Sequence, residues 1–324
     1  MDVIEEILRV LENHNKFVIS THISPDGDAL GAQLGLLSFL NDLGKQVWAV
    51  NTDPVPAVYK FLPFSDVISS SPPALFDILI VVDAGSLVRI GDDLSKVLLP
   101  EKAIINIDHH VTNDRFGNYN WIDADACAVS ELIYQLIKRH GMSIGQKRAS
   151  CLYTGIMTDT GGFRFSNTTP VAHRIAAELI AEGISVDEIY RFVYESLPSS
   201  RIKLLGLVLS TLQVSLDGKI AWICVTQNMY ERTGTTQEDT ENFIDYVKSI
   251  ATVEVALFFV ELKSGKTKVS FRSKNEFDVS KVAANWGGGG HQRAAGCTIK
   301  ASIDETEKIV IADVQRELET ERAN

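Results

Sequence analysis

The first residues that could do chemistry are one imidazole and two carboxylates within seven positions: His22, Asp26 and Asp28. They follow a short apolar run at 17–19 and precede a helical pattern of leucines. This context predicts a strand, a tight turn and a helix, and therefore a loop at the sheet edge where open α/β folds bind ligands. The residue types suit Mn²⁺, Mg²⁺ or Zn²⁺. A plain Pro-Asp-Gly turn, with Asp28 capping the helix, would explain the same residues without a metal.

Three further segments place Asp or His directly after a predicted strand or helix. Their residues are Asp83, Asp108, His109, His110 and Asp159. Each segment alone has an ordinary explanation as a helix cap, a loop residue or a chance pair of histidines. Because the carboxyl ends of parallel strands meet at one edge of a sheet, the four segments together predict a shared metal centre.

This set of side chains favours two metal ions over one. Two imidazoles and four carboxylates give each ion several ligands, provided that one carboxylate bridges. A pair of ions about 3.5–4 Å apart can activate water and stabilise an in-line displacement at phosphorus. Mixed His and Asp ligation without cysteine favours Mn²⁺, with Mg²⁺ as a substitute.

The elements that must position these residues are predicted to form two domains, the usual arrangement for 324 residues. Continuous apolar runs at 77–83 and 103–107 are typical of strands covered on both faces of a parallel sheet. Further along the chain, 214–222 contains an Asp-Gly hairpin turn, and 237–250 fits a helix. We predict an α/β domain with a mainly parallel sheet at 1–187, a helical linker at 188–209 and a smaller α+β domain at 210–324.

The composition excludes several classes of protein. Hydrophobic residues make up 45% of the chain without a run of eighteen, so no membrane span is expected. The net charge of −11 argues against wrapping long nucleic acid, but it allows a short anionic substrate at a local metal site. The acidic N-terminal helical pattern does not resemble a signal peptide, and the scattered cysteines lack paired spacing. These features predict a reducing, cytoplasmic location.

The four segments resemble, in order and spacing, the signature motifs of the DHH phosphoesterase superfamily. The glycine run 287–290, followed by His291 and Ala294-Ala295-Gly296, resembles the DHHA1-type second domain of that superfamily. With 162–169 after the fourth motif, the chain is most similar to nano-RNases of the NrnA type. Those enzymes hydrolyse very short RNA to mononucleotides and remove the 3′-phosphate from 3′-phosphoadenosine 5′-phosphate.

The resemblance implies a role for each candidate residue. One Mn²⁺ would be held by His22 and Asp26, the second by Asp28, His109 and Asp159, and Asp83 would bridge them. The catalytic pair would be His110, facing the substrate phosphate, and Asp108, orienting its neighbours.

The second domain is implied to grip the substrate. Arg272 and His291 match that role best, because a guanidinium can bind phosphate in a bidentate manner. Further candidates for substrate binding are Gly289, Gly290, Arg293 and, in the first domain, Arg164. A flexible glycine turn and a solvated Arg293 are the plain alternatives.

The implied function is that of a metal-dependent, exonuclease-type phosphoesterase for short single-stranded RNA or a nucleotide, with a homodimer left open. The alternative enzyme is a phosphodiesterase of cyclic or linear dinucleotides such as c-di-AMP or pGpG. The non-enzyme alternative is a nucleotide-binding regulatory protein, against which the complete set of ligands argues. The segment around His291 argues against a family II pyrophosphatase, and the chain length against a RecJ-type exonuclease.

Overall fold

The computed structural model describes residues 2–91, 102–215 and 217–323, and the chain forms two compact units, Met1–Ser196 and Leu197–Asn324. The range 188–209 contains most of helix α7 (Val186–Tyr194) and all of helix α8 (Ser199–Leu209). Its role as a linker stays a prediction. Within the described ranges, every helix is too short or too polar to cross a lipid bilayer.

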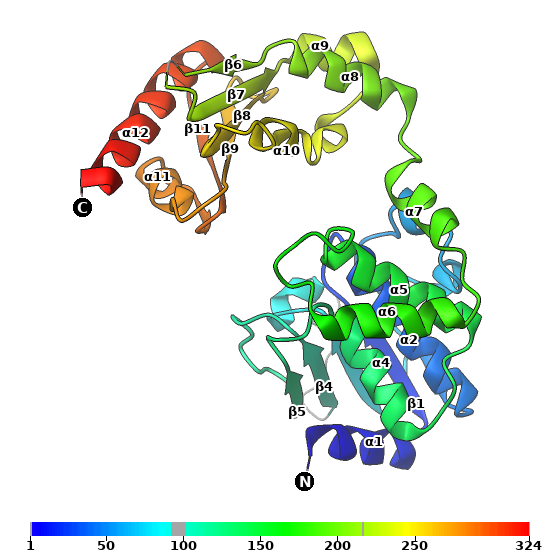
Figure 1. Ribbon diagram of the computed structural model, residues 1–324. Coiled ribbons are helices and arrows are strands. Elements are labelled where there is room, and N and C mark those ends of the chain that lie inside the picture. The colour runs from blue at the N-terminus through cyan, green and yellow to red at the C-terminus, as the bar shows by residue number, and fades with distance from the viewer. Residues whose placement is uncertain (1, 92–101, 216, 324) are drawn as a thin grey trace. The chain divides into compact units, whose positions relative to one another are not determined.

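The first unit is built on a five-stranded sheet with the order β2-β1-β3-β4-β5 (Figure 1). The strands are β1 (Lys16–Ser20), β2 (Gln46–Ala49), β3 (Ile78–Val82), β4 (Ala103–Asp108) and β5 (Tyr119–Ile122). All four pairings are parallel, so the predicted α/β class is confirmed. The carboxyl ends of β1, β3 and β4 therefore lie along the same edge of the sheet.

Side chains cover the sheet on both faces, as the continuous apolar runs predict. Phe17 and Ile80 belong to the main core, which the long helices complete, whereas Val18 and Leu79 point to the opposite face and pack with Ile90. The helices of the main core are α1 (Val3–Asn13), α2 (Gly27–Asp42), α4 (Val129–His140), α5 (Gln146–Asp159) and α6 (Pro170–Ala181). Single 3₁₀ turns occur at η1 (Ala57–Tyr59), η2 (Ser65–Val67) and η3 (Leu87–Ile90).

Helices α2 and α5 pack unusually closely because glycines line their contact. A Cβ atom at Gly31 would lie 2.5 Å from the carbonyl oxygen of Cys151, and one at Gly155 would lie 2.7 Å from Asp28 Oδ1 on α2 and 1.9 Å from Ser130 Oγ on α4. Such distances leave no room for any side chain. The glycines bring the start of α2, which carries Asp28, against α4 and α5.

The second unit contains a six-stranded mixed sheet with the order β10-β11-β9-β8-β7-β6. Only β7 and β8 pair in parallel; the other pairings are antiparallel. The strands are β6 (Gln213–Val214), β7 (Ile220–Val225), β8 (Val255–Glu261), β9 (Thr267–Ser273), β10 (Gly289–His291) and β11 (Ala294–Ile299). Helices α11 (Val279–Asn285) and α12 (Ile303–Ala323) cover one face, and α8, α9 (Gln227–Thr233) and α10 (Phe243–Lys248) the other. This agrees with the predicted α+β domain.

Two local predictions differ from the structure. The single helix predicted at 237–250 is wrong: a 3₁₀ turn, η4 (Gln237–Thr240), and helix α10 replace it, because Asn242 has a φ of 63° that interrupts the helical backbone. Strand β5 escaped prediction, since a four-residue edge strand carries almost no periodic signal. The predicted hairpin of β6 and β7 is present, although Leu216 of its turn lies outside the described residues.

Candidate metal centre

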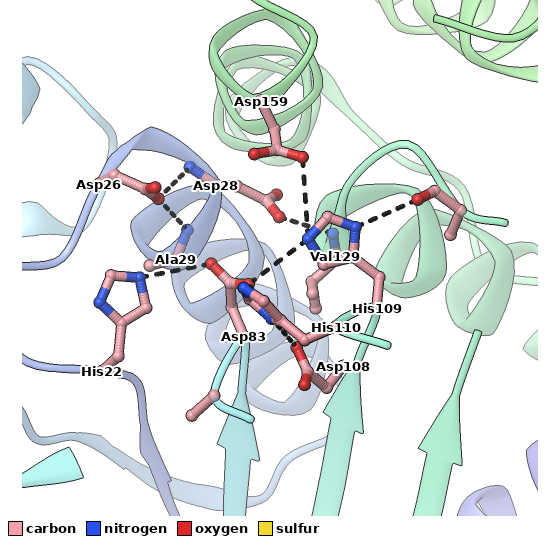
Figure 2. A network of polar contacts seen from close by, with 12 residues as sticks. His22, Asp26, Asp28, Ala29, Asp83, Asp108, His109, His110, Val129 and Asp159 are labelled. Atoms are coloured by element: carbon pink, nitrogen blue, oxygen red, sulfur yellow. Dashed lines mark hydrogen bonds and ion pairs between the residues drawn. The ribbon is translucent and has the colours of Figure 1, made fainter. Parts of the chain in front are cut away.

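Asp83 lies immediately after β3, and its carboxylate faces imidazoles from two other strands (Figure 2). Its Oδ2 is 3.5 Å from Nε2 of His22, and its Oδ1 is 3.8 Å from Nε2 of His109. The residue is buried and has a φ of 56°, a conformation that non-glycine residues seldom adopt. Backbone strain of this kind is concentrated at functional sites. Asp83 is therefore held at the centre of the cluster at some conformational cost.

Hydrogen bonds orient the side chains of His22 and Asp26, which lie on either side of the first loop. The Nδ1 atom of His22 lies 2.8 Å from the carbonyl oxygen of Ile23, so Nε2 is the nitrogen that faces the cluster. Asp26 is the N-cap of α2, where Oδ1 accepts the N–H groups of Asp28 and Ala29 at 3.0 Å each. A helix cap is thus present together with the cluster, but Asp26 supplies it, whereas the plain alternative expected Asp28.

Asp28 caps a different helix from the one expected. It lies in the first turn of α2, but its two oxygens accept the N–H groups of Val129 at 2.6 Å and Ser130 at 2.9 Å, at the start of α4. The cap of α2 itself is Asp26. One carboxylate therefore joins α2, α4 and the cluster.

His109 and Asp159 complete the other side of the cluster. His109 directs Nδ1 to the carbonyl oxygen of Ala126 at 3.1 Å, while Nε2 lies 3.7 Å from Oδ2 of Asp159. Asn167 donates from Nδ2 towards Asp159 Oδ2, the carbonyl oxygen of Asp159 and that of Cys127, at 3.3, 3.1 and 2.9 Å. Both ligand candidates are thus held by groups outside the cluster.

His110 lies edge-on to the ring of His109, with 5.0 Å between the ring centres, and pairs with Asp108. Its Nδ1–H donates to Asp108 Oδ1 at 2.7 Å, and about half of the His110 side chain (49%) is exposed. This hydrogen bond to the buried carboxylate raises the pKa of His110 to about 9. Burial would raise the pKa of Asp108, but its hydrogen bonds with His110 and Asn113 outweigh this and lower it. The pair is therefore an imidazolium with a carboxylate at neutral pH.

The remaining carboxylates repel one another in an enclosed space. Burial, with the charge of Asp83, raises the pKa values of Asp26 and Asp28, that of Asp28 strongly. Burial and the charges of Asp83 and Asp26 raise the pKa of Asp159 to about 6. Divalent cations would relieve this repulsion, because they favour the ionised carboxylates.

Among the residues that the structure describes, three groups of potential ligands have donor atoms within 4.8 Å of one another. They are His22, Asp26 and Asp83; Asp28, His109 and Asp159; and Asp83, His109 and His110. The first two groups use nitrogen and carboxylate oxygen, which suits divalent ions such as Mn²⁺. Carbonyl oxygens at Nδ1 of both His22 and His109 supply the support that metal-binding imidazoles need. The side chains therefore fit a pair of metal ions.

The candidates in the second unit have mixed surroundings. Arg272, half-buried on β9, donates from Nη1 to the carbonyl oxygen of Phe271 at 3.0 Å, whereas Arg293 pairs with Glu276 at 3.1 Å. His291 is exposed at the end of β10. In the first unit, Arg164 is exposed, and its guanidinium lies 5.2 Å from the centre of the Phe165 ring.

The two glycines proposed for substrate binding differ in their space. A Cβ atom at Gly290 would lie 2.5 Å from the carbonyl oxygen of Ala294, and its φ of 147° also favours glycine. Gly288 is similarly confined, with 2.2 Å to the carbonyl oxygen of Gly296. Packing of β10 on β11 thus explains both glycines without a ligand. A Cβ atom at Gly289 would meet nothing within 4 Å, so this glycine leaves room for a ligand.

Comparison with known proteins agrees with this geometry. A model of the DHH family N-terminal domain matches residues 16–156, and a model of the DHHA1 domain matches residues 220–319. A protein of Thermus thermophilus named "Bifunctional oligoribonuclease and PAP phosphatase NrnA" is 36% identical over 98% of this chain and 94% of its own. The chain belongs to the DHH phosphoesterase family. The resemblance predicted from the motifs is confirmed.

Two further proteins match nearly the whole chain. The Bacillus subtilis protein of the same name is 32% identical over 96% of this chain and 97% of its own. The crystal structure of an exopolyphosphatase-related protein from Bacteroides fragilis is 32% identical, covers 98% of this chain and 96% of its own, and has a TM-score of 0.88. The similarity thus extends over nearly the whole chain.

Sequence reasoning missed two asparagines that support the site. Asn167 follows the fourth DHH motif, and Asn113 follows the third by three residues. An asparagine in the loop after a motif is a weak signal by itself, because loops are rich in asparagine. Only the contacts of their side-chain amides distinguish these two from other loop residues.

Proposed function

We propose that this protein hydrolyses phosphoester bonds in very short RNA, yielding mononucleotides, and converts 3′-phosphoadenosine 5′-phosphate to AMP. The observation that carries the proposal is the meeting of two ligand groups at Asp83 in a chain of the DHH family. Support for the substrates comes from the names of the relatives, which are bifunctional oligoribonucleases and PAP phosphatases.

In this proposal the cofactors are two Mn²⁺ ions, with Mg²⁺ as a substitute. His22 and Asp26 would hold one ion, Asp28, His109 and Asp159 would hold the other, and Asp83, which lies near both groups, would be a ligand shared between them. When bound, the pair would act as Lewis acids at the phosphoryl group and lower the pKa of water. The chain contributes by orienting the ligands through contacts outside the cluster. The first turn of α4 donates N–H groups to Asp28, backbone carbonyl groups contact Nδ1 of the imidazoles, and the amide of Asn167 donates to Asp159.

His110 serves the substrate in this proposal. Because Asp108 occupies Nδ1, the Nε2–H group is the one that a phosphoryl oxygen can meet. An imidazolium there stabilises the negative charge that builds up as the phosphorus–oxygen bond breaks. Its pKa of about 9 keeps that charge in place at neutral pH.

The second unit provides recognition of the nucleotide. Arg272 and His291 are the groups that we assign to phosphate, and Gly289 allows a close approach to the backbone of β10. Arg293 and Arg164 are secondary candidates, since the former already pairs with Glu276.

The proposed location is the cytoplasm, which the four free cysteine thiols suit. The proposed assembly is a homodimer, and light scattering of the purified protein tests it.

The experiment is a product time course with metal-depleted full-length protein to which Mn²⁺ or Mg²⁺ is returned. Labelled RNA of two to twenty-four nucleotides is offered beside 3′-phosphoadenosine 5′-phosphate, c-di-AMP, pGpG and pyrophosphate. The expected result is a rate that is greatest for the shortest RNA, with AMP formed from the phosphorylated adenosine. Equal rates at all lengths, or turnover of a cyclic dinucleotide or pyrophosphate alone, would contradict the proposal. Nucleotide binding without any turnover would favour a regulatory protein.

A further inference from the structure

Asn113 lies in the loop after β4 and makes an unusual concentration of contacts with one amide group. Its Nδ2 atom is 2.6 Å from Asp108 Oδ2, 2.9 Å from Asn106 Oδ1 and 3.2 Å from the carbonyl oxygen of Ala84. Its Oδ1 atom accepts the N–H group of Arg115 at 2.7 Å. Three acceptors on one side and one donor on the other fix which end of the amide is which.

These contacts connect the two strands that carry the site. Ala84 directly follows Asp83 at the end of β3, and Asn106 and Asp108 belong to β4. Asn106 and Asp108 are fully buried, so the amide of Asn113 provides hydrogen bonds that water cannot replace. Removing Nδ2 would leave Asp108 Oδ2 without its shortest contact.

The two oxygens of Asp108 have separate partners. Oδ2 accepts from Asn113, and Oδ1 accepts from Nδ1 of His110 at 2.7 Å. A carboxylate held at one oxygen cannot rotate freely about its terminal bond, so the direction of the other oxygen is fixed as well. The chain of contacts therefore runs from Asn113 through Asp108 to the imidazole of His110.

We propose that Asn113 is a positioning residue for catalysis, which holds Asp108 so that the Nε2–H group of His110 points to the substrate phosphate. This rests on the role proposed above for His110. Asn113 is outside the three groups of potential metal ligands. It should therefore affect the rate of the reaction and leave metal affinity unchanged.

The kinetic test compares Asn113→Leu, which keeps the size and removes the amide, with Asn113→Ser, which keeps one donor. Asn120→Ala is the control, because the Asn120 amide also makes short hydrogen bonds but only with the backbone of Gly117. Its Oδ1 accepts the Gly117 N–H group at 2.9 Å, and its Nδ2 donates to the Gly117 carbonyl oxygen at 2.6 Å. With a dinucleotide and saturating Mn²⁺, Asn113→Leu should lower kcat at least tenfold while KM and the Kd for Mn²⁺ stay within about threefold. Asn113→Ser should lie between, and Asn120→Ala should retain the wild-type kcat.

A double-mutant cycle then separates positioning from general stabilisation of the fold. If Asn113 acts through His110, adding Asn113→Leu to His110→Ala should change kcat by less than twofold. The same loss of kcat in both backgrounds, or an equal loss of Mn²⁺ affinity, would contradict the proposal. So would a kcat for Asn113→Leu within twofold of that of the wild type.

A spectroscopic measurement decides the matter even if the protein proves inactive on RNA. In long-range ¹H–¹⁵N spectra of the imidazoles without substrate, the Nδ1–H of His110 should give a downfield, slowly exchanging signal, assigned by its loss in His110→Ala. Asn113→Leu should broaden or shift it, and Asn120→Ala should not. An unchanged signal in Asn113→Leu would overturn the positioning role. A wild-type protein that shows the signal but hydrolyses no phosphoester would instead overturn the proposed function.

Discussion

The carboxylate of Asp28, on α2, accepts the backbone N–H group of Val129 at the start of α4, at 2.6 Å. A hydrogen bond thus spans 101 positions of the chain and ends inside the candidate metal centre. The proposed ligand set and the packing of two helices share one side chain, so a substitution that damages either should affect the other.

Asp28→Ala and Asp28→Asn are expected to separate these two roles. The alanine variant loses both acceptors of the α4 cap and should be less stable by about 1–2 kcal/mol in urea unfolding with EDTA present. The asparagine variant keeps one acceptor oxygen and removes a buried charge, so it should unfold close to the wild type. Both variants should lose one Mn²⁺ site in calorimetric titration. Two intact sites in Asp28→Asn would remove Asp28 from the ligand set.

Asp83 should reveal a trade between stability and function. Its φ of 56° favours glycine over alanine, so in EDTA Asp83→Gly should be more stable than Asp83→Ala by about 1 kcal/mol. Neither variant should hydrolyse RNA, and neither should bind two Mn²⁺ ions. Thermal unfolding and metal titration of the pair check this. Activity in either variant would contradict the bridging position of Asp83.

Metal affinity should depend on pH in the range where Asp159 titrates. Burial and neighbouring carboxylates raise the pKa of Asp159 to about 6, and a carboxyl group must lose its proton to bind a metal. As pH falls through 6, protons therefore compete with Mn²⁺, and the Kd should increase. Titrations between pH 5.5 and 8, in buffers with different ionisation enthalpies, should also show proton release. A Kd for Mn²⁺ that stays constant over this range would contradict the raised pKa of Asp159.

Gly155 should tolerate no side chain. A Cβ atom there would lie 1.9 Å from Ser130 Oγ and 2.7 Å from Asp28 Oδ1, so Gly155→Ala should destabilise the protein by about 1–3 kcal/mol and weaken Mn²⁺ binding. The control is Gly206→Ala in α8, where no atom lies within 4 Å. That change should stabilise the protein by about 0.5–1 kcal/mol, because alanine favours helices. Chemical denaturation measures both, and equal effects would contradict the close packing of α2 and α5.

The glycine-rich strand offers a similar contrast. Gly288→Ala meets the carbonyl oxygen of Gly296 and should lower the Tm, whereas Gly289→Ala has open space and should leave it unchanged. If the substrate approaches the backbone of β10, Gly289→Ala should raise KM severalfold with little change in folding. Steady-state kinetics on a dinucleotide check this. An unchanged KM would place the substrate elsewhere.

The sequence by itself determined the class of fold, and it predicted which residues would meet in the candidate metal centre. The motif residues lie at or just beyond the ends of strands β1, β3 and β4 and at the end of α5, so local periodicity placed them in the chain. Parallel pairing then made their convergence predictable. The break at Asn242 and the short strand β5 were not predictable, because one depends on a single backbone conformation and the other on a neighbouring strand.

Only the tertiary structure decided how the side chains share their duties. The Pro-Asp-Gly sequence suggested a single capped helix, α2. Packing of α2 against α4 lets Asp28 also cap α4, a helix far away in the chain. The amides of Asn113 and Asn167 became significant only when strands and loops far apart in the chain enclosed them. Hydrogen-bond partners are selected by proximity in space, and the pattern of residue types along the chain does not specify which distant residues come close together.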